Sequence, residues 1–347
     1  MIVKKKVPLP EELPLATIYD VGRRAGVSVA TVSSVINNTS YVSPELRKRV
    51  EEAIRELAYS PNLLARGLAR KRTLTIGVLV PDIANFFFPE VVRGVEDKAT
   101  KAGYNIVLGN SDNRLDKEAL YLKMFLANRM DGIVLVKAPG EVDPELERSL
   151  KASSVPIVLL DREYSKLGAD SVSVDNIGGG YMATQHLLEL GHRRIGIIGG
   201  IPCTSTTEGR FRGYQMALKE AKVTLDPCLV STGDYGIDSG YRAGRALLEH
   251  RPTAVFVTNY MMTIGLLQAL EEQKLSTPKD ISIVSYDGFV WNDVFAPRLT
   301  CVEQPKYKLG FTAAEVLLSR IQKKHKRPQH LVLGNSLRVR ETSARCS

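Results

Sequence analysis

The C-terminal three quarters of the chain alternate between short apolar runs and amphipathic segments, and this alternation limits the possible folds more than any other feature. Seven runs are predicted strands: 74–80, 104–109, 132–136, 155–160, 194–199, 254–258 and 281–286. Most are apolar throughout, as parallel strands are when helices cover both faces of their sheet. Helical patterning lies between them, for example over 89–103 and 180–191. The pattern predicts a doubly wound α/β fold, and about 270 residues are enough for two lobes.

A different pattern precedes the first predicted strand, over residues 16–37 with the sequence ATIYDVGRRAGVSVATVSSVIN. Its spacing predicts a helix over 18–25, ended by Gly26 in the left-handed conformation. Ser28 is expected to cap a second helix by accepting a hydrogen bond from the Thr31 amide. Val32 and Val35 lie three apart and are expected to face the first helix. The segment is therefore predicted to form two short helices joined by a tight turn.

The second predicted helix leaves small side chains pointing outward: Ala30, Thr31, Ser33, Ser34 and Asn37. This is the helix-turn-helix geometry that fits a DNA major groove, although a small helical hairpin without DNA binding is the alternative. Charge favours DNA. Residues 1–72 hold 13 Lys or Arg against 7 Asp or Glu, whereas the rest of the chain holds 34 against 31. Phosphate attraction explains such an asymmetry.

A third helix is predicted to begin at Ser43-Pro44-Glu45, with a capping serine followed by proline in the first turn. The three helices form an all-α headpiece over 16–60, preceded by a basic arm over 1–15. Residues 61–72 contain a short candidate helix that Gly67 weakens. This segment is either an exposed linker or a hinge that folds only with DNA and a partner chain.

Several classes of function are disfavoured. No apolar run reaches the roughly 18 residues of a membrane helix, and the lysines near the N-terminus precede prolines and glutamates, unlike a signal peptide. Four scattered cysteines suit a reducing cytoplasm, and neither they nor the five histidines have metal-ligand spacing. No nucleophile elbow, Walker loop or zinc-protease motif is present. We expect no enzyme activity, cofactor or metal.

Ligands of open α/β sheets bind beyond the carboxyl ends of the strands. The residues at these ends form a polar and aromatic set: Asp82, Phe86, Phe87, Phe88, Asn110, Lys137, Asp161, Arg162, Thr204, Ser205, Thr206, Asp234, Tyr235, Asn259 and Asp287. Carboxylates and amides bond hydroxyls while aromatic rings cover apolar faces, so the set suits a small hydroxyl-rich ligand. Any single member could instead cap a helix.

From Ala16 onward the chain resembles the lactose-repressor (LacI/GalR) family of bacterial transcription regulators. The resemblance is carried by TIYDVGRRAGVSVATVSSVIN, by YSPNLLARGLARKRTLTIGVLVPDIANFFFPEVVRGVE, and by GHRRIGIIGG, ISIVSYDGF and LTCVEQP in the family's order. It implies a two-lobed body similar to type I periplasmic binding proteins, with crossovers near Ser173, Gln304 and Val332. Lobe 1 would comprise 73–173 and 305–332, and lobe 2 would comprise 174–304 and 333–347.

The resemblance also implies a homodimer whose two headpieces bind double-stranded DNA at a pseudo-palindromic operator. Segment 62–70 would be a hinge helix with Leu68 as its minor-groove wedge. The DNA-binding residues implied are Val29, Ala30, Ser33 and Ser34 toward bases, Thr17, Tyr19, Thr31, Asn37 and Asn62 toward the backbone, and Ser28 at the helix start. Ser34 stands where many members carry a large basic or imidazole side chain, so its base preference is expected to differ.

For the small-molecule effector, the resemblance implies a site of eight residues: Phe87, Phe88, Asp161, Thr206, Tyr235, Asn259, Asp287 and Gln304. Thr204 and Glu208 occupy positions where well-studied members place an effector-holding arginine. Glu208 is expected to repel an anionic effector, so a neutral sugar is favoured over a purine-like ligand. The alternative is a phosphorylated carrier protein as partner, which would require a basic patch on lobe 1, where Arg93 and Arg114 are available.

Overall fold

The computed structural model describes residues 16–59, 72–288, 294, 296–324 and 327–346. The chain divides into two compact units, 1–73 and 74–347, which are described separately. Thr73 therefore belongs with the N-terminal unit, one residue later than the boundary expected from sequence. The arm over 1–15, Asn62, Leu68 and the predicted hinge helix lie outside the described residues.

The N-terminal unit contains the three predicted helices, α1 (Ile18–Ala25), α2 (Val29–Asn37) and α3 (Pro44–Glu56). Helix α1 starts with a capping box between Thr17 and Asp20, and Gly26 ends it with a φ of 65°. The predicted cap of α2 is confirmed, because the Thr31 amide donates to Ser28 Oγ at 3.1 Å. One apolar core joins all three helices: Val21, Ala25, Val32, Val35, Val50 and Ala53.

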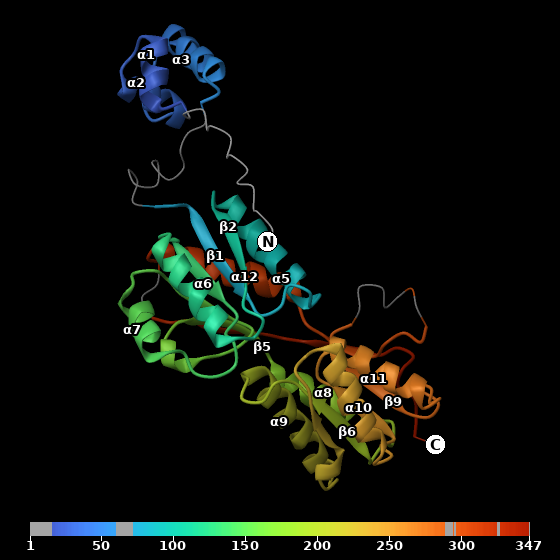
Figure 1. Ribbon diagram of the computed structural model, residues 1–347. Helices are drawn as coiled ribbons and strands as arrows, with labels where there is room; N and C mark the ends of the chain where they lie inside the picture. The colour runs from blue at the N-terminus through green and yellow to red at the C-terminus, as the bar shows by residue number, and fades with distance from the viewer. Residues whose placement is uncertain (1–15, 60–71, 289–293, 295, 325–326, 347) are drawn as a thin grey trace, which may run out of the picture. The chain divides into compact units, whose positions relative to one another are not determined.

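The C-terminal unit contains two six-stranded sheets, each with helices on both faces (Figure 1). The lobe 1 sheet has the order β11-β5-β4-β3-β1-β2. Its strands are β1 (Thr75–Val80), β2 (Asn105–Asn110), β3 (Gly132–Leu135), β4 (Ile157–Leu160), β5 (Asp170–Val174) and β11 (His330–Leu333). Its helices are α5 (Phe87–Lys101), α6 (Leu115–Ala127), α7 (Pro144–Ala152) and α12 (Lys306–Ile321).

The lobe 2 sheet has the order β12-β10-β9-β8-β6-β7. Its strands are β6 (Ile195–Gly199), β7 (Val230–Thr232), β8 (Ala254–Val257), β9 (Ser282–Tyr286), β10 (Cys301–Glu303) and β12 (Ser336–Arg338). Its helices are α8 (Asn176–Glu189), α9 (Ser205–Glu220), α10 (Ile237–Leu248) and α11 (Tyr260–Glu272). We expected a wholly parallel sheet, but β12 pairs antiparallel with β10.

Three crossovers connect the lobes, as the resemblance implied. The chain passes from β5 to α8, returns from β10 to α12, and passes again from β11 to β12. Two boundaries move by one residue, because Val174 and Leu333 pair with each other in the lobe 1 sheet. All seven predicted strands are present, whereas β5, β7, β10, β11 and β12 were not predicted.

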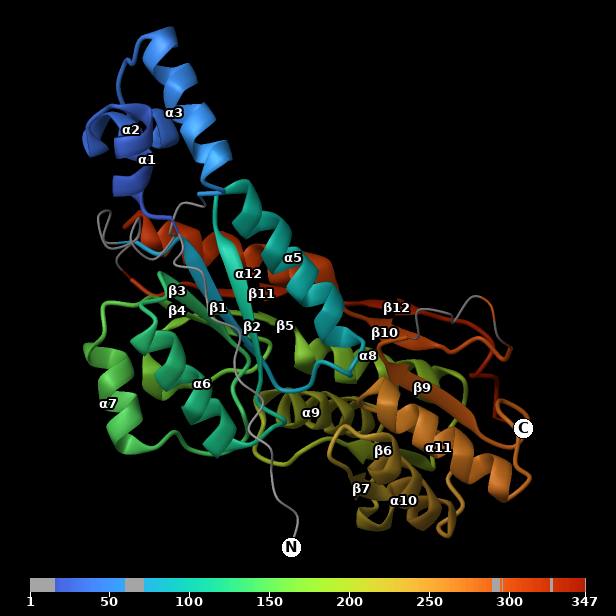
Figure 2. The same ribbon diagram turned by 45° about the horizontal axis from the view of Figure 1, so that its top comes forward.

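Helices α5 and α12 lie side by side on one face of the lobe 1 sheet (Figure 2). Their backbones nearly touch: a Cβ on Gly94 would lie 2.1 Å from Tyr307 O, and one on Gly310 would lie 1.8 Å from Val91 O. Glycine is therefore required at both positions. No helix among the described residues is long and apolar enough to cross a membrane.

Candidate functional site

The first candidate site is the surface formed by α2 and the start of α1 in the N-terminal unit. The described residues that are expected to bind DNA are exposed or half-buried there. Thr17, Tyr19, Ser28 and Ala30 are exposed, whereas Val29, Thr31, Ser33, Ser34 and Asn37 are half-buried. Val32 and Val35 point the other way, into the core. The structure thus separates an apolar face from a face of small polar groups, as a recognition helix requires.

Neighbouring hydrogen bonds order the polar side chains of α2. Asn37 Nδ2 donates to Ser33 O at 2.9 Å, and Ser40 Oγ donates to Ser34 Oγ at 2.9 Å. A serine hydroxyl can both donate and accept, so Ser34 can still accept or donate one further bond. Because the side chain is short, this bond can form only where the helix lies close to the base edge.

The second candidate site is a cavity of about 120 Å³ between the lobes of the C-terminal unit. All eight residues expected to bind the effector line it. Phe87, Phe88 and Asp161 come from lobe 1, whereas Thr206, Tyr235, Asn259, Asp287 and Gln304 follow strands or begin helices of lobe 2. The residues predicted from their position after a strand also include Asp82, Arg162 and Asp234, which line the cavity. Five others of that set do not line it: Phe86, Asn110, Lys137, Thr204 and Ser205.

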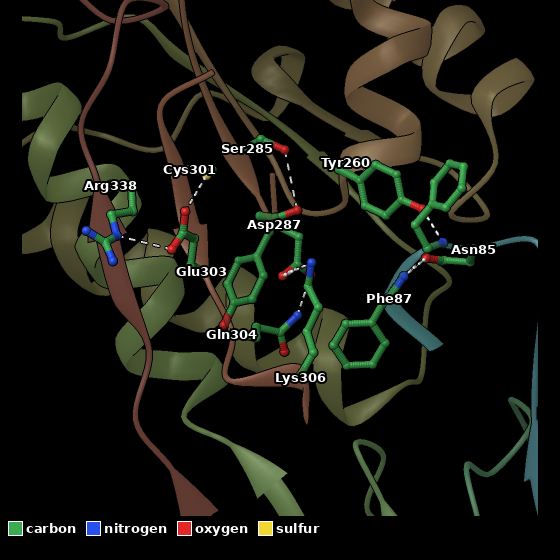
Figure 3. A network of polar contacts seen from close by, with 12 residues as sticks. Asn85, Phe87, Tyr260, Ser285, Asp287, Cys301, Glu303, Gln304, Lys306 and Arg338 are labelled. Carbon is green, nitrogen blue, oxygen red and sulfur yellow. Dashed lines mark hydrogen bonds and ion pairs between the residues drawn. The ribbon is translucent and has the colours of Figure 1, made fainter. Parts of the chain in front are cut away.

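Two buried aspartates face the cavity from opposite lobes. Asp161 follows β4 and Asp287 follows β9, and both have left-handed backbones with φ of 64° and 65°. Gln304 Nε2 donates to Asp287 Oδ2 at 2.6 Å, and Lys306 Nζ lies 3.6 Å from Asp287 Oδ1 (Figure 3). Burial raises the pKa of Asp161 above its ordinary value, although Arg210 and Arg162 oppose the shift.

Arg210 on α9 is a cavity residue that the sequence reasoning missed. Its buried guanidinium donates to Asn176 Oδ1 at 2.9 Å and to Thr258 O at 2.7 Å, and it stacks 3.7 Å over the Tyr286 ring. The expected repulsion of an anion by Glu208 is wrong, because Glu208 is exposed and does not line the cavity. The signal for Arg210 would have been an arginine on the helix stripe that faces the sheet.

Arg162 is the second cationic side chain of the cavity. Its Nη1 donates to Asn113 Oδ1 at 2.8 Å and to Lys137 O at 2.9 Å. Lys137 itself turns away from the cavity and pairs with Glu118 at 3.0 Å, with both side chains buried. The prediction that Lys137 faces the ligand site was wrong, because Glu118 of α6 holds its ammonium group behind the cavity wall.

Tyr235 forms an aromatic wall whose orientation is fixed at its far end. Its hydroxyl lies 3.1 Å from Thr204 Oγ1, 3.0 Å from Thr206 Oγ1 and 2.6 Å from Thr207 Oγ1. Thr204 also caps α9, which explains why it does not face the cavity. The three threonines therefore hold the tyrosine ring toward the ligand space.

Aromatic residues of lobe 1 close the opposite side. Phe87 and Phe88 pack edge to face with ring centroids 5.0 Å apart. Next to them, the Phe86 amide donates a hydrogen bond to the Tyr260 hydroxyl of lobe 2, so the lobes are joined beside the cavity. Glu163 N also donates to Ser205 Oγ across the lobes at 2.9 Å. These bonds hold the two lobes together around the cavity.

Comparison with known proteins finds relatives of both parts of the chain. Residues 17–62 match the model for bacterial regulatory proteins of the lacI family, and residues 184–343 match a periplasmic binding protein-like domain. The chain is 39% identical over 333 residues to the HTH-type transcriptional repressor PurR of Escherichia coli O139:H28 (strain E24377A / ETEC). That alignment covers 95% of this chain and 97% of the relative. The chain belongs to the LacI family of bacterial transcription regulators.

Two solved structures of LacI-family regulators are similar over nearly the full length. The lac repressor dimer bound to operator and the anti-inducer ONPF has a TM-score of 0.84 at 29% identity, covering 95% of this chain and 99% of that one. The complex of the transcriptional regulator CelR with cellobiose has a TM-score of 0.71 at 34% identity, covering 94% and 99%. The family's headpiece and two-lobed body are therefore both present here.

Proposed function

We propose that this protein is a transcription repressor that binds operator DNA as a homodimer and is controlled by a neutral sugar or sugar derivative in the cavity between its lobes. The observation that carries the proposal is the unsatisfied hydrogen-bonding capacity of the cavity. Three acceptors have no hydrogen-bond partner within the described residues: Asp161 Oδ1, Gln304 Oε1 and Asp287 Oδ1, the last of which has only the ion pair with Lys306 at 3.6 Å. Among the donors, Arg162 Nε has no hydrogen-bond partner within the described residues.

A ligand that satisfies this cavity must mainly donate hydrogen bonds. Each unpaired buried acceptor costs about 1–3 kcal/mol, so a ligand that fails to donate is penalised. Sugar hydroxyls donate and accept, and the aromatic walls suit the apolar faces of a sugar ring. Arg210 and Arg162 offset part of the charge of Asp161, and Lys306 pairs with Asp287. These buried carboxylates therefore need no ionised ligand as a partner, which favours a neutral ligand.

A nucleobase is the second candidate, because the 39% identical relative is named PurR and Phe87, Phe88 and Tyr235 could contact a flat ring. A base offers fewer donors than a sugar, so it satisfies fewer of the free acceptors. Control by a phosphorylated carrier protein has less support. Arg93 already pairs with Glu96 and Asp97, and Arg114 pairs with Asp116.

Exposed apolar side chains support a homodimer. Strand β2 is an edge strand that exposes Leu108, and the adjacent α6 exposes Leu120 and Met124. A second copy seated on this face would bury them. Two headpieces would then read a pseudo-palindromic operator, with α2 in the major groove and Leu68 in the minor groove. Binding to chromosomal DNA implies a cytoplasmic protein associated with the nucleoid.

Control of DNA binding follows from linkage between the two sites. An effector that contacts both lobes stabilises the arrangement in which they close around it, and it shifts the dimer only by its difference in affinity for the two arrangements. Asp161 contributes from lobe 1 and Asp287 from lobe 2, so the effector can bridge them. No enzyme chemistry is needed for this role.

The decisive experiment is a thermal-shift screen of the full-length protein against sugars, including cellobiose and ribose, and against nucleobases. A ligand at 100 times its Kd stabilises the protein by about 2.7 kcal/mol. The best ligand is then tested for its effect on binding to an operator selected from random duplexes. Asp287→Ala should abolish this effect and leave ligand-free DNA binding intact. A nucleobase shift with no sugar shift would select the second candidate, and absence of DNA selection would refute the regulatory role.

A further inference from the structure

One edge of the lobe 1 sheet carries a concentrated positive charge. All six strands run parallel, so they begin along the same edge, next to the C-terminal ends of α5, α6, α7 and α12. The four segments that join these helices to the following strands contain nine Lys or Arg and one Asp, over 98–104, 124–131, 149–156 and 318–329. This density exceeds what the balanced composition of residues 73–347 would produce.

Basic residues are common at helix C-termini, where they interact with the helix dipole, so helix polarity is one explanation for the charge of this edge. Lobe 2 tests this explanation, because its helices α8, α9, α10 and α11 also lead into parallel strands. The corresponding segments contain eight Lys or Arg against seven Asp or Glu, over 186–194, 217–229, 245–253 and 269–281. Helix polarity alone therefore does not explain the excess in lobe 1.

Part of the excess is neutralised by acidic residues outside these segments, in the pairs Lys98–Glu315, Lys151–Glu147 and Arg320–Asp170. The other three described lysines of these segments are Lys101, Lys323 and Lys324. They are exposed and form no ion pair with any described residue. Lys101 and Lys324 line a surface groove of about 410 Å³ between α5 and α12, and Lys323 lines one of about 510 Å³ beside α7. We name these three lysines the basic edge.

The basic edge lies where the chain enters the C-terminal unit. Strand β1 begins at Thr75 on this same edge, and the preceding Leu74 N donates to Asp131 Oδ2 at 3.3 Å, which fixes the entry point. The headpiece is therefore tethered to this edge and not to lobe 2. Once a headpiece binds DNA, the tether raises the local concentration of phosphate near the basic edge.

We propose that the basic edge binds the phosphate backbone of DNA that flanks the base pairs read by the headpieces. The proposal rests on the proposed function, because it requires DNA to be bound. Lysine contacts phosphate as a point charge and reads no base, so the basic edge adds affinity without sequence preference. Each contact releases condensed counterions, so it steepens the salt dependence of binding.

The test compares two duplexes by fluorescence anisotropy over a range of salt concentrations, using the full-length protein. One duplex ends with the operator, and the other extends it by roughly 15 base pairs of unrelated sequence on each side, about one and a half helical turns. The variant combines Lys101→Gln, Lys323→Gln and Lys324→Gln. On the long duplex, its plot of log K against log salt should be shallower by about 0.9 for each phosphate that the variant no longer neutralises. On the short duplex it should match the wild type.

The matched control combines Lys219→Gln, Lys222→Gln and Lys279→Gln, three exposed lysines at the equivalent edge of lobe 2. It removes the same net charge and should leave both slopes unchanged. Equal slopes for the wild type and the lobe 1 variant on the long duplex overturn the proposal, as does an equal effect of the control. Unchanged DNA slopes together with abolished binding to anionic lipid vesicles would assign the edge to another partner. A wild type that binds neither duplex refutes the proposed function itself.

Discussion

Replacement of Asp161 by asparagine should raise the thermal stability of the protein at neutral pH and lower its affinity for the effector. The carboxylate is buried at the cavity wall, and its Oδ1 has no hydrogen-bond partner within the described residues. Asparagine has nearly the same shape and tolerates the left-handed backbone of this position better than most residues. The substitution therefore changes charge and hydrogen bonding with little change in packing.

The expected stability change follows from the buried negative charge, which asparagine lacks. Burial of the carboxylate disfavours its charged form, and the attraction of Arg210 and Arg162 offsets part of this cost. We therefore expect a gain of about 1 kcal/mol, which corresponds to an increase in Tm of roughly 2–4 °C for a domain of this size. Effector binding should fall by at least tenfold, about 1.4 kcal/mol, since the cavity then offers one acceptor fewer.

The gain should depend on pH in a defined direction. Burial raises the pKa of Asp161 in the folded protein. The stability that this group contributes is therefore fully present below the unfolded pKa of about 3.9, and it is lost as the pH rises through the folded pKa. The variant lacks this loss. The stability difference should therefore be absent near pH 4 and grow toward neutral pH.

Thermal unfolding from about pH 4 to 8, followed by circular dichroism, measures the stability of both proteins. Isothermal titration with the ligand found by the screen measures affinity. Asp161→Leu is a useful second variant, because it removes the polar group but adds strain at a positive φ. A lower Tm for Asp161→Asn at pH 7.5 would refute the reasoning about the buried charge. Unchanged affinity would remove Asp161 from the effector site.

Three further predictions address other parts of the molecule. Leu68→Ala should weaken operator binding at least tenfold in anisotropy assays without lowering effector affinity, and a parallel loss of both would contradict its assignment as a wedge. Val32→Ala removes a fully buried side chain from the headpiece core and should destabilise that unit by about 1–3 kcal/mol, which abolishes DNA binding but leaves the ligand-induced thermal shift. Gly94→Ala should destabilise the C-terminal unit by about 1–3 kcal/mol, since its Cβ would meet Tyr307 O at 2.1 Å. Gly334→Ala, whose Cβ meets nothing within 4 Å, is the control for calorimetry.

The sequence predicted seven strands because most of them are apolar throughout, and it missed strands whose stability comes from distant partners. In β5, buried Asp170 is held by Arg320 of α12, and Ser171 Oγ lies 2.8 Å from His330 Nδ1 of β11. Neither partner is near in sequence, so the run DSVSV has no local signal of a buried strand. Strands β7 and β12 are three-residue edge strands, too short for a periodic pattern to be recognised.

The candidate effector site was predicted more fully than the strands, because parallel topology brings strand ends together whatever the side chains are. Position relative to a strand end does not determine where a long side chain points. Lys137 follows β3, but Glu118 on a neighbouring helix draws it away from the cavity. Arg210 lies within a helix, and its burial depends on Asn176 and Thr258, which come from two other segments.

The return of the chain to lobe 1 has a consequence for biosynthesis. Helix α12 packs along α5 and against the lobe 1 sheet, yet it is encoded by residues 306–321, after nearly all of lobe 2. While the ribosome translates residues 175–304, the side of α5 that packs against α12 has no cover from its own lobe. Lobe 1 can complete its core only when α12 and β11 emerge, whereas the headpiece can fold at once. A nascent chain of this protein therefore acquires its DNA-reading unit long before it has a body that could respond to a signal.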